Sequence, residues 1–292
     1  MFVVDGTAQR ILRGTAATLT FQGRDSDGEP ADPGTVTVGV TRSDGSDVIA
    51  AGTATTAVGT ARTVALTAAQ TATLDVLYAT WTVSGVAIAT TRHDVVGGFY
   101  FVVDDLRAGE PSTSTGPTTA ETRTLRAYVE TMIEQATGTS FVPRFDVAVV
   151  TGAVTRDLVL PRWYLRSVRW VRLWSSNTIT LNLESDEVEA IQPDTAGILH
   201  LDRSTEGLRV EVGFEHGLDA PPADVARESL RFARQQHNRA ASRALPEAST
   251  SLRLDNGSFV TLATPGVGNW HTGIPSVDDM IRRYSRQRLG IA

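Results

Sequence analysis

The first third of the chain consists of short stretches in which apolar and polar residues alternate, the pattern of half-buried β-strands. The alternation is clear around Leu19 and Phe21 and again around Trp81 and Val83. Turn signals such as Asp27-Gly28 separate these stretches. Roughly seven such strands in about 105 residues predict an all-β, two-sheet sandwich of the immunoglobulin type.

The aromatic run that ends this part of the chain continues the strand pattern. Residues 99–103 read Phe-Tyr-Phe-Val-Val, and we expect them to form a further strand of the sandwich. The chain has no cysteine, so no disulfide can join the two sheets. The sandwich core is therefore expected to depend on Phe21, Trp81 and Phe99.

A change of composition follows the sandwich. Residues 107–118 are dominated by small, polar, proline and glycine residues, which favours a linker. We therefore predict three parts: a sandwich over 1–106, a linker over 107–118 and a second domain over 119–292. A long surface loop within a single domain is the alternative.

The second domain begins with a helix. Thr118 and Glu121 have the spacing of a capping box, in which each residue satisfies a backbone N–H group of the other. Apolar residues then recur at helical spacing, and Gly138 supplies the end. The expected buried face consists of Leu125, Val129, Met132 and Ala136, with Tyr128 and Ile133 beside it.

Strand patterns return over residues 145–215, and the sharpest is the strict alternation of Leu208, Val210, Val212 and Phe214. Further strands are expected at 157–160, 168–174, 179–183 and 197–201. The domain is thus predicted to be α+β, with an antiparallel β cluster and three main helices.

The two remaining helices carry the residues of most interest. After Pro221-Pro222, one helix side holds Val225, Ala226, Ser229, Leu230, Ala233 and Ala240, and the opposite side holds Arg227, Arg231 and Arg234. A hairpin is expected around Asp255-Asn256-Gly257, followed by a Gly/Pro-rich loop over 264–275. The last helix is expected to be capped by Ser276, with Val277, Ile281 and Tyr284 on one face.

Composition excludes several chemistries. All 27 basic residues are arginines, so a Schiff-base lysine and a P-loop lysine are absent, and the lack of cysteine excludes thiol nucleophiles and cysteine-ligated metals. The net charge of −6 argues against a general grip on nucleic acid. No apolar run approaches the ~20 residues of a membrane helix, and the first residues do not form a signal peptide. We expect a soluble, non-secreted protein with no membrane partner.

No catalytic motif is found. The five histidines have no metal-ligand spacing, and no serine lies in a nucleophile elbow. We therefore predict no catalytic, cofactor-binding or metal-binding residues, no cofactor and no enzymatic activity. A hydrolase site assembled from distant segments remains an alternative.

The arginines of the second and last helices have two interpretations. Arg227, Arg231 and Arg234 form either a solvated face balanced by Asp224 and Glu228, or a contact surface for acidic residues of a neighbouring subunit. The same alternatives apply to Arg282, Arg283 and Arg286 on the last helix.

Three segments carry a family resemblance. Residues 210–217 (Val-Glu-Val-Gly-Phe-Glu-His-Gly) are followed by Pro221-Pro-Ala-Asp-Val225, and residues 273–278 read Gly-Ile-Pro-Ser-Val-Asp. Together with the Phe141-Val-Pro143 turn, these segments resemble head-to-tail connector or adaptor proteins of tailed bacteriophages, particularly those infecting actinobacteria. The resemblance covers about residues 119–292, so the sandwich is an addition to the family pattern.

The resemblance implies a structural virion protein. Such proteins form a ring, twelvefold, between the portal protein and the stopper or tail-terminator protein, and double-stranded DNA passes through the ring without sequence readout. The implied location is the head–tail junction of the virion, with assembly in the host cytoplasm. The residues expected at subunit or portal contacts are Arg227, Arg231, Arg234, Val277, Ile281, Arg282, Tyr284 and Arg286. For the apolar face of the last helix, packing in the protein's own core is the favoured alternative to docking on the portal.

The charge is unevenly divided between the two parts. Residues 1–110 carry a net −5 and residues 111–292 a net −1, so the acidity belongs mostly to the sandwich. A nearly neutral core suits DNA passage better than DNA capture, because each neutralised phosphate adds affinity. A second hypothesis is a carbohydrate- or surface-binding module with the sandwich as the binder; Trp81 and Tyr100 are its aromatic candidates.

Overall fold

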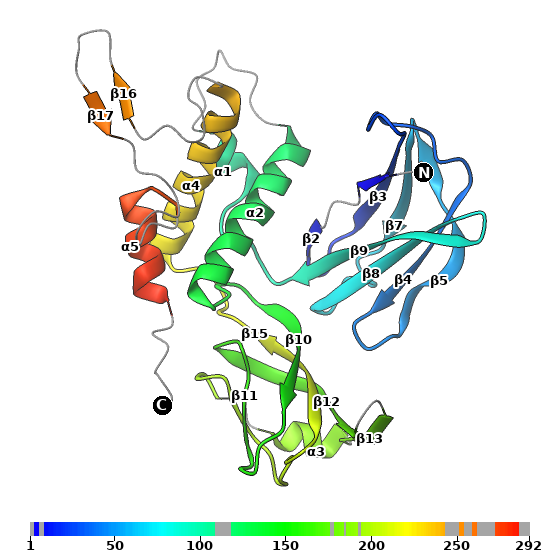
Figure 1. The fold of residues 1–292 in the computed structure, drawn as a ribbon, viewed down its shortest axis with the longest axis vertical. Helices are drawn as coiled ribbons and strands as arrows, with labels where there is room; N and C mark the ends of the chain where they lie inside the picture. Colours follow the sequence, from blue (N-terminus) through cyan, green and yellow to red (C-terminus); the bar gives the residue numbers. More distant parts are fainter. Residues whose placement is uncertain are drawn as a thin grey trace. The chain divides into compact units, whose positions relative to one another are not determined.

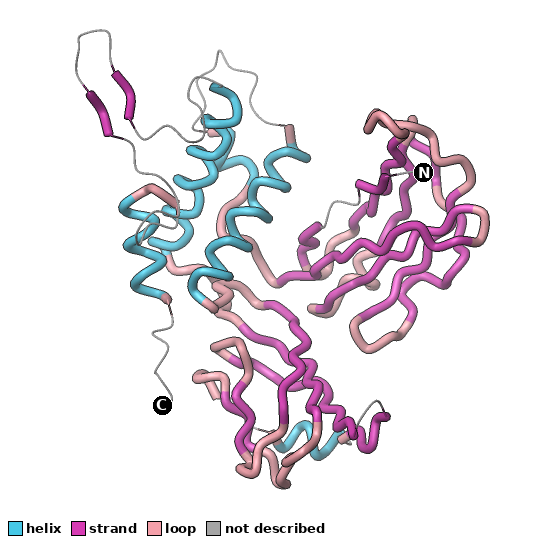
Figure 2. Tube along the Cα trace, viewed as in Figure 1, coloured by secondary structure: helices cyan, strands magenta, loops and turns pink. Residues whose placement is uncertain are grey.

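The computed structural model is a mixed fold in which strands predominate, with five helices among the described residues (Figures 1 and 2). It describes residues 3–5, 9–108, 118–175, 178–183, 185–191, 194–242, 251–253, 259–261 and 272–285. Internal contacts divide the chain into two compact units, residues 1–98 with 142–219 and residues 99–141 with 220–292. The domain boundaries at 106 and 119 remain a prediction, and residues 109–117 of the expected linker lie outside the described residues.

The N-terminal part of the first unit is a two-sheet sandwich. One sheet has the order β1-β3-β7-β6 and the other β2-β9-β8-β4-β5, and every pairing is antiparallel except β2 with β9. The strands are β1 (Val3–Asp5), β2 (Gln9–Leu12), β3 (Ala17–Arg24), β4 (Val36–Arg42), β5 (Asp47–Ala54), β6 (Thr56–Val58), β7 (Ala61–Leu66), β8 (Asp75–Val83) and β9 (Val86–Val96).

The sandwich core follows the alternation of its strands. Leu19 and Phe21 on β3 and Trp81 on β8 are fully buried, and the rings of Phe21 and Trp81 stack with centroids 5.4 Å apart. The expectation for these two aromatic residues is therefore confirmed. The expected strand over residues 99–103 is wrong, because β9 ends at Val96 and Phe99 belongs to the second unit.

The first unit also contains a second β domain. Its four-stranded antiparallel sheet has the order β10-β15-β12-β13, and β11 pairs with β14 beside it. The elements are β10 (Arg144–Thr151), β11 (Asp157–Val159), β12 (Leu165–Ser175), β13 (Thr178–Asn182), α3 (Ser185–Ala190), β14 (Ile198–His200) and β15 (Arg209–His216). The strands expected in this region are confirmed, while the short helix α3 was not predicted.

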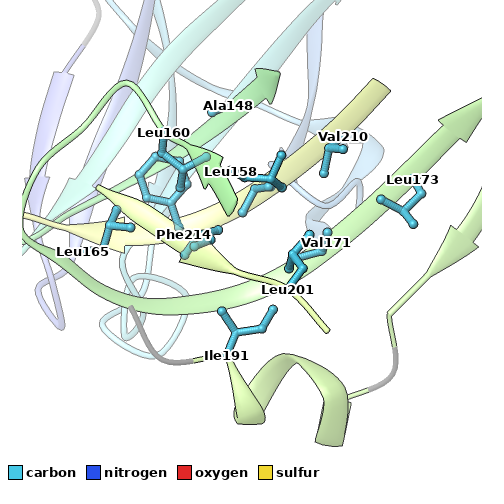
Figure 3. Close-up of a cluster of buried hydrophobic side chains, with 12 residues drawn as sticks. Ala148, Leu158, Leu160, Leu165, Val171, Leu173, Ile191, Leu201, Val210 and Phe214 are labelled. Atoms are coloured by element: carbon cyan, nitrogen blue, oxygen red, sulfur yellow. The ribbon is translucent and has the colours of Figure 1, made fainter. Parts of the chain in front are cut away.

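One apolar cluster forms the core of this β domain. Val210, Val212 and Phe214 of β15 are fully buried, as the strict alternation predicts. Figure 3 shows Val210 and Phe214 with side chains of the neighbouring strands and with Ile191, which follows α3. A smaller cluster on the other sheet face joins Phe145 and Trp170 to Leu74 and Val76 from the sandwich.

The second unit is helical. It contains α1 (Val103–Arg107), α2 (Thr119–Thr137), α4 (Ala223–Ser242), α5 (Pro275–Tyr284) and the hairpin strands β16 (Ser251–Arg253) and β17 (Phe259–Thr261). The antiparallel pairing of β16 with β17 confirms the expected hairpin, although its turn lies outside the described residues.

The start and end of α2 agree with the sequence. Glu121 N donates to Thr118 Oγ1 and Thr118 N donates to the Glu121 carboxylate, which completes the capping box. Hydrogen bonds to the Glu121 carboxylate from the Thr118 backbone N–H and from its hydroxyl lower the pKa of the Glu121 carboxyl group. The helix ends at Gly138, whose φ of 69° lies in the left-handed region that glycine tolerates.

The most buried face of α2 differs from the expected one. Leu125, Met132 and Ala136 are only half-buried, and the fully buried face includes Arg126 and Glu130. Apolar periodicity could not locate this face, because charged residues occupy two of its positions. The complete buried set is Thr122, Arg126, Val129, Glu130, Ile133 and Thr137.

The buried charges of α2 hold the segment that precedes α1. The Arg126 guanidinium lies 3.3 Å from the centre of the Phe99 ring and donates to the Phe101 carbonyl oxygen. The Glu130 carboxylate accepts a 2.8 Å hydrogen bond from Tyr100 N. The aromatic run is thus an extended strap on α2, and its polar backbone groups are satisfied by side chains rather than by a β ladder.

The Tyr100 side chain closes this arrangement. Its hydroxyl donates to the Glu134 carboxylate (3.1 Å) and accepts from Phe141 N (3.1 Å). The Tyr100 and Phe141 rings also meet edge to face at 5.7 Å. One side chain therefore joins the strap, the end of α2 and the residues that follow the helix.

We expect Tyr100→Phe to lower the free energy of unfolding by about 1–3 kcal/mol, because the buried Phe141 N–H group loses its acceptor. Chemical denaturation measures this change. Tyr128→Phe is the matched control, since Tyr128 is 55% exposed and its loss of a hydroxyl is expected to be neutral. Equal stability of the two variants would contradict the assigned role.

Gly213→Ala tests the β domain. A Cβ atom at this position of β15 would overlap the indole ring of Trp170, which packs across the glycine. We expect a loss of about 1–3 kcal/mol of stability from overpacking, measured by denaturation of the full chain. Gly98→Ala is the control, because its Cβ would meet Val142 at an ordinary 3.4 Å; an effect as large as that of Gly213→Ala would refute the steric explanation.

Candidate assembly surface on α4 and α5

Helix α4 begins where the sequence predicts it. Pro221-Pro222 precedes its first residue, Ala223, and Asp224 supplies negative charge in the first turn, where the helix dipole favours it. Val225, Ser229 and Ala233 are fully buried, as the expected face requires. Phe232 is buried as well, although it was not assigned to that face.

The arginine stripe opposite this face is only partly a common surface. Arg227 and Arg231 are exposed, with 73% and 62% of their side chains accessible. Arg234 is half-buried and donates to the carbonyl oxygen of Asp105 in α1 (2.6 Å). Arg234 therefore fastens α4 to α1, and the outward stripe consists of Arg227 and Arg231.

Glu228 anchors these two arginines. Only 7% of its side chain is exposed, and its carboxylate accepts from Ser276 Oγ of α5 (2.6 Å) and Arg227 Nε (2.9 Å), with Arg231 at 3.8 Å. Burial raises the pKa of Glu228, but the hydrogen bonds from Ser276 and Arg227 outweigh it, so the pKa lies below its ordinary value. The carboxylate is therefore ionised near neutral pH and attracts both guanidinium groups.

A second carboxylate joins α4 to the end of α5. Asp224 accepts hydrogen bonds from Arg283 (2.6 Å) and from the Tyr284 hydroxyl (3.0 Å). The Tyr284 ring lies edge to face against Phe141, with centroids 5.1 Å apart. Tyr284 thus connects α4, α5 and Phe141.

The apolar face of α5 lies in the protein's own core. Val277 and Ile281 are fully buried, together with Met280 and Ile274. Of the two expected roles for this face, packing within the chain is the one that the described residues show. The surface available for contacts is instead the charged side of the two helices.

The remaining predicted contact residues differ in their surroundings. Arg282 is exposed and pairs with Asp279 one turn earlier (3.0 Å), while Arg286 lies outside the described residues. Ser276 is not the N-cap of α5: Ile274 holds that position, and Ser276 donates to Glu228. The wrong prediction has a clear cause, since the serine hydroxyl is used between helices rather than within one.

The sequence also gave no signal for the turn that leads into α5. Asp278 is completely buried and accepts from the backbone N and the hydroxyl of Thr272. This carboxylate fixes the residues just before α5. Residues 264–271 of the expected loop lie outside the described residues.

The described part of the chain contains no group of three or more metal-ligating side chains. His200 lies 2.6 Å from Asp157 on the surface of β14 and β11, and both side chains are more than half exposed. Among the described helices, none combines the length and apolar character needed to cross a membrane.

Comparison with known proteins gives structural neighbours only. No protein-family model and no curated protein matches the sequence. A chain from the neck of an empty gene transfer agent (GTA) particle, computed with C6 symmetry, is 20% identical over 65% of this chain and 91% of its own, with a TM-score of 0.40. A chain from the virion of a native GTA particle is 20% identical over 65% of this chain and 89% of its own length, with a TM-score of 0.41.

A third neighbour is of a different kind. Domains 5–6 of the S-layer protein SbsC are 14% identical over 73% of this chain and 95% of their own length, at a TM-score of 0.23. All three identities are below 25% and all three TM-scores below 0.5, so none of these similarities assigns a function.

Ser276→Ala is expected to lower stability by about 2 kcal/mol, because the buried Glu228 carboxylate loses a charge-assisted hydrogen bond. Arg227→Ala removes a largely exposed partner of the same carboxylate and should cost less than about 1 kcal/mol. Urea denaturation of both variants measures the difference. If Arg227→Ala costs as much as Ser276→Ala, Arg227 is a structural residue and is not available for contacts with other subunits.

Proposed function

We propose that this protein is a structural subunit of a phage-type particle, and that it forms a ring at the head–tail junction. In this proposal the ring lies between the portal and the stopper or tail-terminator protein and surrounds the path of double-stranded DNA. The family resemblance gives twelve as the expected number of copies. The proposal assigns no catalytic step and no cofactor to the chain.

The observation that carries the proposal is the position of the family-like segments in the fold. They coincide with the boundaries of the elements that form and frame the helical unit. Residues 210–217 are β15 without its first residue, followed by Gly217, whose φ of 99° permits the turn. Pro221-Pro222 precedes α4, Ile274-Pro275 begins α5, and Phe141 packs against Tyr284.

The charged side of α4 and α5 is the proposed subunit contact. Arg227 and Arg231 are exposed yet oriented, Arg227 by Glu228 and Arg231 by its hydrogen bond to Ser276 Oγ (3.0 Å) beside Glu228. Each therefore presents part of a planar guanidinium group without the full entropic cost of ordering a free side chain. A ring needs two different complementary faces on each subunit. We assign these arginines to one such face and an acidic surface of the neighbouring copy to the other.

A DNA channel requires weak contacts with phosphate. Glu228, Asp224 and Asp279 each pair with arginine, so any part of α4 and α5 that a neighbouring subunit leaves open to the channel carries a reduced positive charge. Such pairing favours passage of DNA over capture, because release of counterions by unpaired cations would give salt-sensitive affinity.

The N-terminal sandwich is proposed to be an immunoglobulin-like addition to the adaptor. Its consecutive strands β3 and β4 lie in different sheets, and β8 and β9 pair beside β4, as in that fold. The carbohydrate-binding alternative lacks its expected aromatic residues, because Trp81 and Tyr100 are 0% and 2% exposed. We therefore propose a structural role for the chain as a whole.

Negative-stain microscopy of the purified protein mixed with the portal protein of the same particle tests the ring. We expect an added ring of density on the portal. The double variant Arg227→Gln/Arg231→Gln should require roughly tenfold more protein for the same occupancy, if the pair contributes about 1.4 kcal/mol of contact energy. Circular dichroism of the variant verifies that it is folded.

Arg156→Gln is the matched control, since Arg156 is exposed on the β domain and has no ion-pair partner among the described residues. It should assemble like the unmodified protein. Failure of the unmodified protein to add density to the portal would refute the adaptor function. Normal assembly of the double variant would refute only the assignment of the arginine surface.

A further inference from the structure

A chain of three polar side chains lies inside the N-terminal sandwich. Trp81 Nε1 donates to Thr91 Oγ1 (3.2 Å), and the same oxygen lies 2.8 Å from His93 Nε2. His93 is 1% exposed. Its second ring nitrogen, Nδ1, is buried and has no hydrogen-bond partner among the described residues.

This arrangement disfavours the protonated, positively charged form of the His93 imidazole. A protonated ring carries two N–H donors, and only Nε2 has an acceptor within reach. The second donor would be buried without a partner, next to the apolar sandwich core. Burial accordingly lowers the pKa of His93 to about 4, against a small opposing effect of the Asp94 carboxylate.

The charged groups around His93 do not offset this cost. Asp94, the next residue on β9, is held by Arg92 (2.8 Å). On β2, Gln9 is directly opposite His93, and Arg10 is opposite Asp94. Two further charged side chains of the sandwich are buried, Asp75 on β8 and Arg62 on β7. Asp75 pairs with Arg42 of β4, and Arg62 pairs with Asp32.

The position of His93 connects it to more than the sandwich core. Leu77 of β8 is directly opposite His93 in the β8–β9 pairing. Val76, the preceding residue of β8, packs with Leu74 against Phe145 of the second β domain. Disturbance of β8 from the His93 side would therefore also weaken the cluster on its other face.

We propose that His93 makes the N-terminal sandwich acid-sensitive, so that the opening equilibrium of β8 and β9 rises at mildly acidic pH while that of the helical unit does not. This inference goes beyond the proposed function and does not depend on ring assembly. The unfolded chain binds a proton at His93 near pH 6.5, whereas the folded sandwich resists it until about pH 4. Stability from the neutral ring is therefore complete above pH 6.5 and is lost as the pH falls toward 4.

The carboxylates act at lower pH. Asp44 and Glu228 have lowered pKa values, so their contributions are retained until the pH falls to the ordinary carboxyl values of 3.8 and 4.5. As the pH falls from 6.5 to about 5, His93 is thus the first of these groups whose protonation favours the open state of β8 and β9. The expected increase in the opening equilibrium constant of β8 and β9 between pH 7.5 and 5 is about 30-fold.

Two measurements on the full chain test this proposal. NMR titration should give a pKa near 4 for the His93 ring. The exposed His200 is followed in the same spectra as an internal reference. Hydrogen exchange, corrected for intrinsic rates, should show the roughly 30-fold increase in opening for residues 75–96 but not for residues 223–238 of α4. A His93 ring that titrates near 6.5 would overturn the proposal without any variant.

Variants separate His93 from the other acid-sensitive groups. His93→Gln cannot be protonated, so its β8 and β9 should open to the same extent at pH 7.5 and 5, whatever its absolute stability. His200→Gln should retain the pH dependence of the unmodified protein. Equal pH dependence in His93→Gln and the unmodified protein would contradict the proposal.

Discussion

The arrangement of the helical unit depends on the buried charges of α2. Arg126 and Glu130 occupy its most buried face, where an unpaired charge would cost several kcal/mol. Both are used to bind the strap of residues 99–101, through a guanidinium–aromatic contact and hydrogen bonds to backbone groups. The strap does not pair as a strand, and these side chains take the place of a β ladder for its backbone groups. The residues that follow the sandwich are therefore a structural part of the helical unit.

A second set of charges determines what α4 and α5 can present to other molecules. Glu228 and Asp224 are used to join the two helices through Ser276, Arg283 and Tyr284. The apolar residues of α5 are buried by the same packing, so the exposed side of the two helices is charged rather than apolar. Such a surface favours specificity and orientation between subunits more than raw affinity. That balance suits the ring proposed above.

The sequence pattern predicted those parts of the fold that depend on interactions between residues close together in the chain. The capping box at Thr118 and the alternation of residues 208–214 depend on neighbours in sequence, and both are confirmed. The strand expected at residues 99–103 is wrong because Arg126 and Glu130, distant in sequence, decide that segment's conformation. Ser276 was assigned to a cap for the same reason, since its partner Glu228 is 48 positions away. The candidate surface was thus half predictable: Arg227, Arg231 and their charge partner Glu228 were identified, but the burial of Glu228 and its hydrogen bond from Ser276 were not.

A cryo-electron microscopy reconstruction of the neck of a particle that carries this protein tests the central claim most directly. The account predicts a closed ring of copies between portal and stopper, with Arg227 and Arg231 of each copy facing acidic residues of the next. Density for the chain at another position in the particle, or as isolated copies that do not touch one another, would contradict it.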